Sequence, residues 1–352
     1  MSSVLQSEVI QVANDPEALY ALSLEEKWGD GAPLIPPTDE RIEAMLQGTP
    51  RLSTDIVNAE VPPKHGMATV ELVAINAVMA GCMPKHLPLV LAALEAMTNA
   101  AYNGFGLATT TGSAATYMII NGPLRDEMDI SYRAGCIGGG AARGSVSVGR
   151  ALQLCLRNIG GMRAGESSRS VFGQPGRFGV CFGEWEERSE WPSLAMQRGF
   201  SREQEVVTVH GSMGTMALLD MNTANDRDLA YLLGKAVATP MSNLFMSMKT
   251  HGEQVVLINP MWAARLAKTF PKIESFQECM FESAWQPIEF WPAPNQVYFR
   301  EHGRVDARDR VYALTGPDRI QPVVCGGLGN LHSTILPSWG ESEMQSMATV
   351  RA

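Results

Sequence analysis

The residues from Cys82 to His86 interrupt the most apolar stretch of the chain with a thiol, an ammonium group and an imidazole. Pro84 favours the first turn of a helix, where its missing N–H has no cost. We therefore expect Cys82 to lie at or just before a helix N-terminus, where the helix dipole and nearby Lys85 would lower the pKa of the thiol. Cys82 would then be a nucleophile. The alternative is a small buried hydrophobic residue, because free cysteine is often buried.

Two glycine-rich stretches, 109–116 and 134–145, are candidate binding sites for an anionic substrate, because backbone N–H groups can approach a ligand there. Thr110 lies in the first stretch, and the second leads into an expected helix. Arg143 lies beside these glycines, so we expect its guanidinium to bind a substrate anion. Neither stretch has the spacing of a P-loop or of the GxGxxG fingerprint, so nucleotide binding is not supported. Tight turns with close helix–sheet packing would explain the same glycines.

Polar residues follow two expected strands. Cys181 and Glu184 lie near the end of "RFGVCFGE", and His332 and Ser333 follow "QPVVCGG" after a glycine turn. α/β proteins hold ligands in the crevice at the carboxyl ends of their strands. We therefore expect Cys181 to be a second candidate nucleophile, with Glu184 and His332 as acid or base. Ser333 is not expected to be a nucleophile, because no GxSxG elbow surrounds it, and we place it among the residues that contact substrate. The alternative for Glu184 is an acidic surface turn.

The elements that must position these residues alternate between helices and short apolar strands. Helical patterns cover 15–29, a short segment after Thr38 or Asp39, 69–80, 84–101, 145–159, 226–239, 260–270 and 273–285. Strand patterns cover 106–111, 115–122, 177–184, 203–211, 253–260 and 321–327. This order predicts an α/β fold with a mixed, mostly buried sheet and flanking helices. Residues 1–352 are expected to form one domain, and if it has two lobes their seam lies near 160–200.

The composition excludes several classes of protein. The chain is 45% apolar and 18% charged, which excludes general disorder, and its net charge of −9 argues against nucleic-acid binding. No stretch is typical of a membrane span or a signal peptide. The six cysteines include no CxxC pair, and the histidines show no HExxH spacing. We therefore expect a reduced cytoplasmic protein without a metal or cofactor.

Four stretches resemble one bacterial protein family: "WGDGAPLIPPTDERIEAML", "TVELVAINAVMAGCMPKHLPLVLAALEAM", "GQPGRFGVCFGE" and "GGLGNLHSTILPSWG". Members of this family often accompany UGSC-type (seleno)proteins, which carry a reactive selenocysteine or cysteine. The chain departs from the family at Trp262, where relatives tend to show histidine, and in the turn "GGLGNLHS", which is longer than the related "GGPGKHS"-like form. The resemblance implies that six positions are characteristic and functional: Glu71, Asn76, Cys82, Asn121, Gln174 and His332.

Two functional hypotheses follow. The first is an enzyme that uses the thiolate of Cys82 or Cys181 on a small carboxylated or polar metabolite, with cleavage or formation of a carbon–heteroatom bond. Lyase, hydrolase and thiol-redox versions stay open. The second is a non-catalytic or half-site subunit that completes the active site of a UGSC-type partner. The 20 methionines would suit such an adaptable contact surface. We also expect a homo-oligomer.

Overall fold

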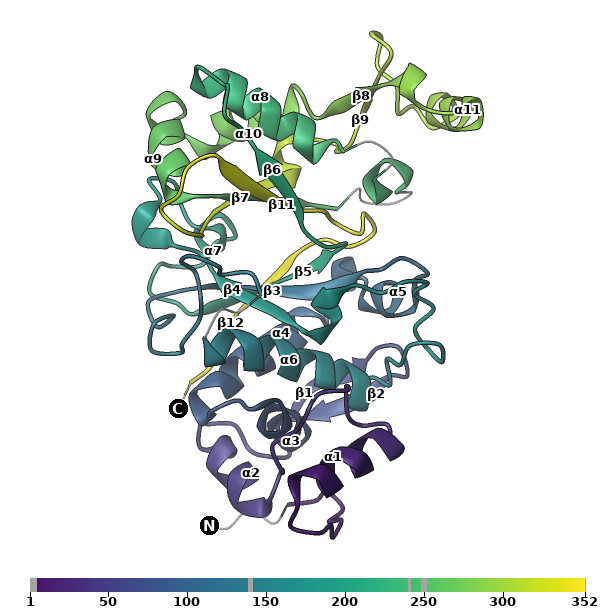
Figure 1. The fold of residues 1–352 in the computed structure, drawn as a ribbon, viewed down its shortest axis with the longest axis vertical. Helices are drawn as coiled ribbons and strands as arrows, with labels where there is room; N and C mark the ends of the chain where they lie inside the picture. Colours follow the sequence, from purple (N-terminus) through teal and green to yellow (C-terminus); the bar gives the residue numbers. More distant parts are fainter. Residues whose placement is uncertain (1–4, 139–141, 240–241, 248–251, 352) are drawn as a thin grey trace.

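Two four-stranded sheets face each other in the computed structural model, which describes residues 5–138, 142–239, 242–247 and 252–351 (Figure 1). The first sheet has the order β12–β5–β3–β4, with β3 at Ala115–Asn121, β4 at Val180–Gly183, β5 at Val206–Ser212 and β12 at Gln345–Ala348. The second has the order β10–β7–β11–β6, with β6 at Met216–Leu219, β7 at Gln254–Ile258, β10 at Ile320–Val324 and β11 at His332–Leu336.

Each sheet contains one parallel pair of strands. β3 pairs with β4 in the first sheet and β7 with β10 in the second, while the remaining neighbours are antiparallel. In the second sheet Ile258 lies opposite Val324, so β7 and β10 end side by side. Parallel pairs are covered on both faces, which explains why β3, β7 and β10 consist almost wholly of buried residues.

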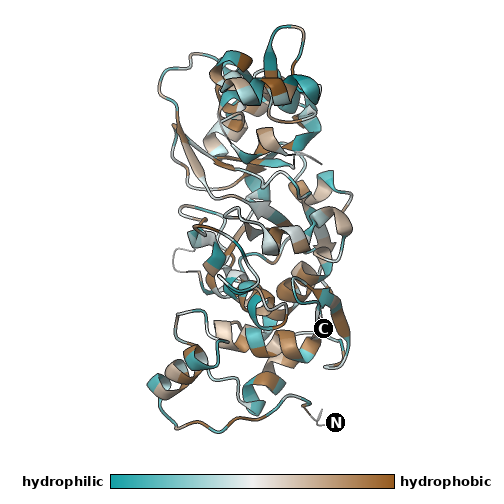
Figure 2. Ribbon diagram, turned by 90° about the vertical axis from the view of Figure 1, so that its right-hand side faces the viewer, coloured by the Kyte–Doolittle hydropathy of each residue, from teal (hydrophilic) through white to brown (hydrophobic). Residues whose placement is uncertain are grey.

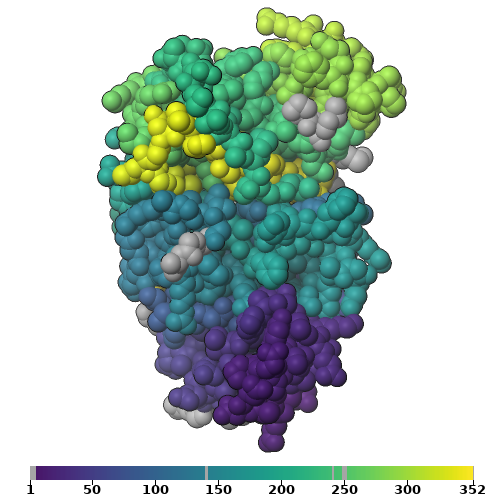
Figure 3. All heavy atoms as spheres, viewed as in Figure 1, coloured from purple at the N-terminus to yellow at the C-terminus, as the bar shows by residue number. Residues whose placement is uncertain are grey.

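A hydrophobic core lies between the two sheets. It joins residues of β3 and β4 to residues of β7, β10 and β11, namely Ala115, Tyr117, Ile119, Phe182, Val255, Leu257, Val323 and Leu336. Figure 3 shows the yellow C-terminal part of the chain lying along the boundary between the teal and green regions. The two lobes therefore share a core and are joined by more than a linker.

Helices form the outer layers (Figure 1). α4 (Leu87–Ala96) and α6 (Arg143–Asn158) pack on the first sheet, and α3 (Val70–Ala80) packs on α6. α8 (Asp226–Val237), α9 (Pro260–Thr269) and α10 (Ile273–Phe281) cover the outer face of the second sheet. The helices at the two ends of the molecule carry both hydrophilic and hydrophobic residues (Figure 2). That mixture suits elements with one face on the core and one in water.

Smaller elements complete the chain. They are α1 (Pro16–Glu25), α2 (Asp39–Leu46), β1 (Ile56–Val61), β2 (Gly66–Thr69), α5 (Gly104–Thr109), α7 (Leu194–Gln197), β8 (Trp285–Pro287), α11 (Ala293–Glu301) and β9 (Arg310–Tyr312). β1 pairs with β2 and β8 with β9, both antiparallel. Within the described residues, no helix combines the length and apolar character that crossing a membrane requires.

Local sequence signals account for the helix starts. The side chain of Asp15 accepts a hydrogen bond from the N–H of Glu17 at the start of α1, and Pro16 follows in the first turn. Asn259 accepts from the N–H of Trp262 at 2.9 Å at the start of α9, where Pro260 follows. Each cap satisfies a backbone donor that the helix itself leaves unpaired.

The expected mixed α/β fold with flanking helices is confirmed. The strand expected over 106–111 is wrong, because Asn103 adopts a left-handed conformation and caps α5 through the N–H of Gly106. The chain passes to the second sheet between β5 and β6 and returns between β11 and β12. Within the range expected for a seam, the N–H of Trp185 donates to the carbonyl of Val324 at 2.6 Å, so this segment contacts the second sheet.

Candidate functional site

A pocket of about 350 Å³ opens where the two lobes meet, and we call it the seam pocket. The loop 134–138 of the first lobe forms one wall, and the ends of β7 and β10 with the start of β11 form the other. The side chains on its wall that bear on chemistry are Cys136, Asn259, Cys325, Asn330, His332 and Ser333. This is the crevice at the carboxyl ends of parallel strands, the usual ligand site of an open α/β sheet.

Backbone hydrogen bonds hold the two walls together. The N–H of Cys325 donates to the carbonyl of Ile258 at 3.0 Å, which extends the β7–β10 pairing by one residue. The next N–H, that of Gly326, donates across the seam to the carbonyl of Tyr132 at 2.9 Å. Cys325 and the loop carrying Cys136 are therefore fixed relative to each other by the fold of both lobes.

Cys136 and Cys325, which we call the pocket thiols, both line the seam pocket, and a hydrogen-bond interaction between their side chains acts on the pKa of each. This bond is the main cause that lowers the pKa of Cys136, and backbone hydrogen bonds, led by that of Ile137, lower it further against the effect of burial. The same bond, burial and the nearby charge of Glu184 raise the pKa of Cys325 well above its usual range. These shifts make Cys136 the more acidic of the two thiols.

Behind Cys325 lies a buried polar network. Burial raises the pKa of Glu184 to about 7, although the Asn121 amide donates to its carboxylate at 2.7 Å and the N–H of Leu194 at 2.8 Å. Asn121 also donates to Glu186 at 3.1 Å, and Arg125 pairs with Glu186 at 3.3 Å. The structure thus brings the predicted residues Asn121 and Glu184 together, beside a thiol that was not predicted.

The predicted residues His332 and Ser333 line the seam pocket itself. The imidazole of His332 is exposed at the rim, and its backbone carbonyl accepts a hydrogen bond from Asn259 at 2.9 Å. Ser333 is buried, and its hydroxyl donates to the carbonyl of Leu257 at 2.8 Å. The hydroxyl proton of Ser333 is therefore already used within the fold.

Cys82 does not have the predicted activated thiol. Gly81 adopts a left-handed conformation and ends α3, and the N–H of Cys82 donates back to the carbonyl of Ala77 at 2.9 Å. The following 3-10 turn begins at Pro84, with Met83 as its cap. Cys82 consequently belongs to the end of α3, and burial raises its pKa to about 12. The expected lowering of the pKa is wrong because desolvation outweighs the nearby positive charge of Arg143.

Cys181 is also buried in the first lobe, within β4. Burial raises its pKa and that of Cys155 in α6. We call Cys82, Cys155 and Cys181 the inner thiols, and all three belong to the core of the first lobe. None of them lines the seam pocket among its described residues.

Arg143 and Lys85 serve the fold around α3 and α6. The Arg143 Nε donates to the carbonyl of Gly81 at 2.9 Å, and the Lys85 ammonium donates to the carbonyl of Glu127. Neither residue is among the described residues that line the seam pocket. Part of the glycine-rich stretch beside Arg143, residues 139–141, lies outside the described residues. The expected contact of Arg143 with a substrate anion stays a prediction.

Thr110 and Gln174 stabilise loops at another edge of the first lobe. The Gln174 side chain accepts a hydrogen bond from the Tyr117 hydroxyl at 2.8 Å and donates to the carbonyl of Ser212 at 2.9 Å. The Thr110 hydroxyl accepts the N–H of Gly112 at 3.1 Å. The first of the two glycine-rich stretches is thus tied to β3 and β5, away from the pocket thiols.

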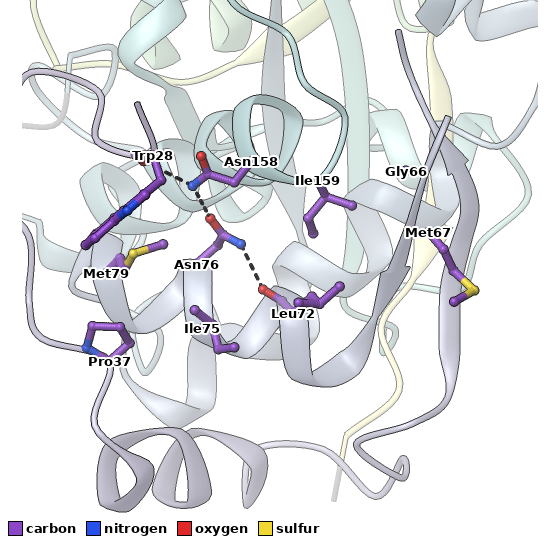
Figure 4. A pocket seen from close by; sticks show the side chains of 10 residues that line it. All are labelled: Trp28, Pro37, Gly66, Met67, Leu72, Ile75, Asn76, Met79, Asn158 and Ile159. Atoms are coloured by element: carbon purple, nitrogen blue, oxygen red, sulfur yellow. Dashed lines mark hydrogen bonds between the residues drawn. The ribbon is translucent and has the colours of Figure 1, made fainter. Parts of the chain in front are cut away.

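Asn76 lines a second pocket, of about 420 Å³, on the first lobe (Figure 4). Its amide donates to the carbonyl of Leu72 at 2.8 Å and accepts from Asn158 at 2.8 Å, and Trp28 and Met79 form apolar walls. Glu71 precedes Leu72, which lines this pocket. The carboxylate of Glu71 accepts hydrogen bonds from the N–H groups of Gln6 and Ser7 and so holds the N-terminal segment in place. Both residues act in the first lobe, apart from the pocket thiols.

The described residues contain no group of three or more His, Cys, Asp or Glu side chains that could hold a metal ion. His86, which could have formed a half-site with Cys82, is buried, and its ring contacts the N–H of Met83 at 3.0 Å and the carbonyl of Met128 at 3.0 Å. Burial lowers the pKa of His86 to about 4, so it is neutral near pH 7.

Sequence reasoning missed Cys136 and Cys325 as functional residues. A signal was present, because glycines follow each cysteine within two residues, in "CIGGG" and in "CGG". In the second case the cysteine also follows a buried strand that ends at Val324. A thiol at a strand's carboxyl end, followed by glycines, is placed where ligands bind.

No protein-family model, no curated protein and no solved structure matches this chain.

Proposed function

We propose that the chain is a cysteine-dependent enzyme that acts on a small polar metabolite in the seam pocket. Cys136 supplies the nucleophile and Cys325 the proton for the leaving group. One observation carries this proposal: two cysteines from different lobes lie on the wall of a single pocket that can admit a small molecule. The thiolate, and not the thiol, is the nucleophile in cysteine chemistry.

The first chemical step uses both pocket thiols. Sγ of Cys136 forms a bond to an electrophilic atom of the substrate, and the bond from that atom to its leaving group breaks. The leaving group takes the proton of Cys325. Glu184 lies behind Cys325 with a pKa of about 7, so it is suited to return that proton. Lyase, hydrolase and thiol-redox versions share this step.

The pocket wall supports a polar substrate. Asn259 and Asn330 offer amide groups, and the glycines after Cys325 leave the backbone open to a ligand. Arg143, which we expected to bind a substrate carboxylate, is not among the described residues of this wall. The family resemblance adds His332 at the rim, where an imidazole can exchange protons with substrate.

Mapping of iodoacetamide modification near pH 7 by mass spectrometry tests the proposal. We expect Cys136 to react fastest, and faster than Cys279, which is partly exposed but has a pKa raised by burial. Cys136→Ser should remove the fast reaction, while the matched control Cys279→Ser should keep it. Modification of Cys279 with Cys136 left intact would contradict the proposed function.

A second candidate function is a half-site subunit for a UGSC-type partner. It is favoured by one feature: His332 is the sole ionisable side chain besides the thiols among the described residues of the pocket wall. A partner would then bring the acid and base groups. We expect a UGSC-type partner to form a mixed disulfide with Cys136 on mild oxidation. Non-reducing gels would show this product, and Cys136→Ser should abolish it.

A further inference from the structure

We infer that the reaction is reductive: Cys136 and Cys325 act as a dithiol that cleaves a sulfur–sulfur bond in a small, uncharged substrate and closes into a disulfide. This inference rests on the proposed function, because it needs Cys136 as the nucleophile. It goes further, because it selects the thiol-redox version of the proposed reaction and names the sulfur–sulfur bond as the bond that breaks.

The placement of the two sulfurs carries the inference. Cys136 belongs to the loop 134–138 of the first lobe and Cys325 follows β10 in the second, yet both residues line one pocket and belong to one buried cluster between the sheets. A substrate that reaches Cys136 therefore forms its covalent intermediate beside a second thiol. Displacement by that neighbouring thiol is effectively intramolecular, so it competes well with attack by water or by an external thiol.

A glycine turn lies beside each of the two cysteines. Gly135 precedes Cys136 with φ +71°, and Gly326 follows Cys325 with φ +94°. A Cβ built at either glycine would meet no atom within 4 Å, so side chains do not pack against these glycines, although the N–H of Gly326 is bonded to the carbonyl of Tyr132. A disulfide requires specific geometry, and glycine turns allow small rearrangements that a helix or a central strand would resist.

The two thiols have the division of roles that thiol–disulfide exchange needs. The hydrogen bonds that reach Cys136 favour its thiolate, which attacks first. Burial and Glu184 keep Cys325 protonated until the leaving thiolate takes its proton. Cys325 is then itself a thiolate and becomes the second nucleophile.

The electron balance is that of a two-electron reduction. The Cys136 thiolate attacks one sulfur of RS–SR, a mixed disulfide forms, and the first RS⁻ leaves with the proton of Cys325. The Cys325 thiolate then attacks Sγ of Cys136, the protein disulfide forms, and the second RS⁻ leaves. The substrate gains two electrons and the pocket thiols lose two. An external thiol of low molecular weight must reduce the protein disulfide before the next cycle.

The pocket selects the class of substrate. Its volume of about 350 Å³ suits a small molecule. Besides the thiols and His332, the described residues of its wall carry no ionisable side chain, whereas Asn259, Asn330 and Thr334 offer uncharged hydrogen-bonding groups. A charged disulfide would lose hydration there without a matching charge, so an uncharged disulfide should react faster.

A single-turnover experiment on the reduced full-length protein tests the inference. The protein is mixed with hydroxyethyl disulfide in the absence of other thiols, released thiol is measured, and cysteine peptides are mapped. We expect two released thiols per chain and a Cys136–Cys325 disulfide. Cys325→Ser should release one thiol and stop at a mixed disulfide on Cys136, while Cys136→Ser should lose the fast reaction. Cystine, which is charged, should react more slowly.

Controls separate this inference from the proposed function. Cys279→Ser should behave as the unaltered protein, and thermal unfolding of each variant checks that it is folded. If the unaltered protein stops at a mixed disulfide on Cys136, or if cystine reacts as fast as hydroxyethyl disulfide, the inference is overturned while the nucleophile stands. If Cys136 reacts with neither disulfide nor iodoacetamide, both proposals are overturned.

Discussion

The inner thiols and the pocket thiols are buried to a similar degree but have opposite surroundings. Cys82 is 7% exposed and Cys136 5% exposed, yet burial raises the pKa of Cys82 to about 12, whereas hydrogen bonds lower that of Cys136. The inner thiols lie within the packed core of the first lobe, while the pocket thiols lie on the wall of a cavity. Exposure alone therefore does not determine the pKa of a thiol: desolvation dominates at Cys82 despite a hydrogen bond with Ser147, whereas hydrogen bonds dominate at Cys136.

The largest expected difference between the two groups of thiols is their rate of reaction with iodoacetamide. The inner thiols should react with iodoacetamide only when the first lobe unfolds, so in native protein they should react more slowly than Cys136 by on the order of a thousandfold or more. In strong denaturant all five thiols of the two groups should react at similar rates. Rapid native modification of Cys82 or Cys181 would remove the distinction between the groups.

The next effect is the pH dependence of stability that we expect from Glu184, the buried carboxyl group near Cys325. Its folded pKa of about 7 lies above the usual value of 4.5, so the folded chain binds this proton more tightly than the unfolded chain. Its contribution to stability is therefore present in full below pH 4.5 and is lost as pH rises towards 7, by up to about 3 kcal/mol.

Glu184→Gln tests this expectation, because glutamine keeps an acceptor for Asn121 and Leu194 but cannot ionise. Urea unfolding at pH 5 and pH 8 should show that the variant gains stability relative to the unaltered protein as pH rises. Glu190→Gln, at an exposed position nearby, is the matched control and should show a much smaller change. A parallel pH dependence for the unaltered protein and Glu184→Gln would show that Glu184 is not the titrating group.

A smaller effect is expected for a polar change among the inner thiols. Cys181→Ser places a hydroxyl in the core beside α6, and an unsatisfied buried hydroxyl lowers the free energy of unfolding by about 1–3 kcal/mol. Cys181→Ala removes the sulfur without adding a polar group, so it is the control that isolates the hydroxyl. Chemical denaturation measures both. A larger loss for alanine than for serine would mean that packing volume, and not polarity, governs this position.

The smallest effect concerns the hydrogen bond between the pocket thiols. Cys325→Ala removes the donor that most lowers the pKa of Cys136, so that pKa should rise. A rise of one unit reduces the thiolate fraction below the pKa about tenfold, and modification near neutral pH should slow accordingly. The pH profile of the iodoacetamide rate at Cys136 measures the shift. An unchanged profile would assign the lowered pKa to the backbone donors instead.

Much of the fold follows from local sequence signals. Caps such as Asp15 and Asn259 mark helix starts, and apolar runs mark β3, β5, β7 and β10. The strand β11 was not predicted, because it follows a glycine turn and carries polar residues at its start. The error at Cys82 arose from reading Pro84 as the main signal, although Gly81 after an apolar helix is the stronger sign of a helix end.

The candidate site could be predicted only in part. His332 and Ser333 were identified from their place after a strand, and Glu184 and Asn121 also lie near the pocket thiols. The pairing of Cys136 with Cys325 could not be read from spacing, because it arises from two sheets packing face to face. No local pattern specifies which loop of one lobe meets which strand end of the other.

The return of β12 to the first sheet has a consequence for biosynthesis. β5 is made well before its partner on the outer side, because residues 345–348 leave the ribosome more than a hundred residues later. At ordinary rates of translation this delay is on the order of ten seconds. During that time the outer edge of β5 has no strand to pair with. The nascent protein must hold an open strand edge through that interval, so chaperone protection during synthesis would matter more for this chain than its final architecture suggests.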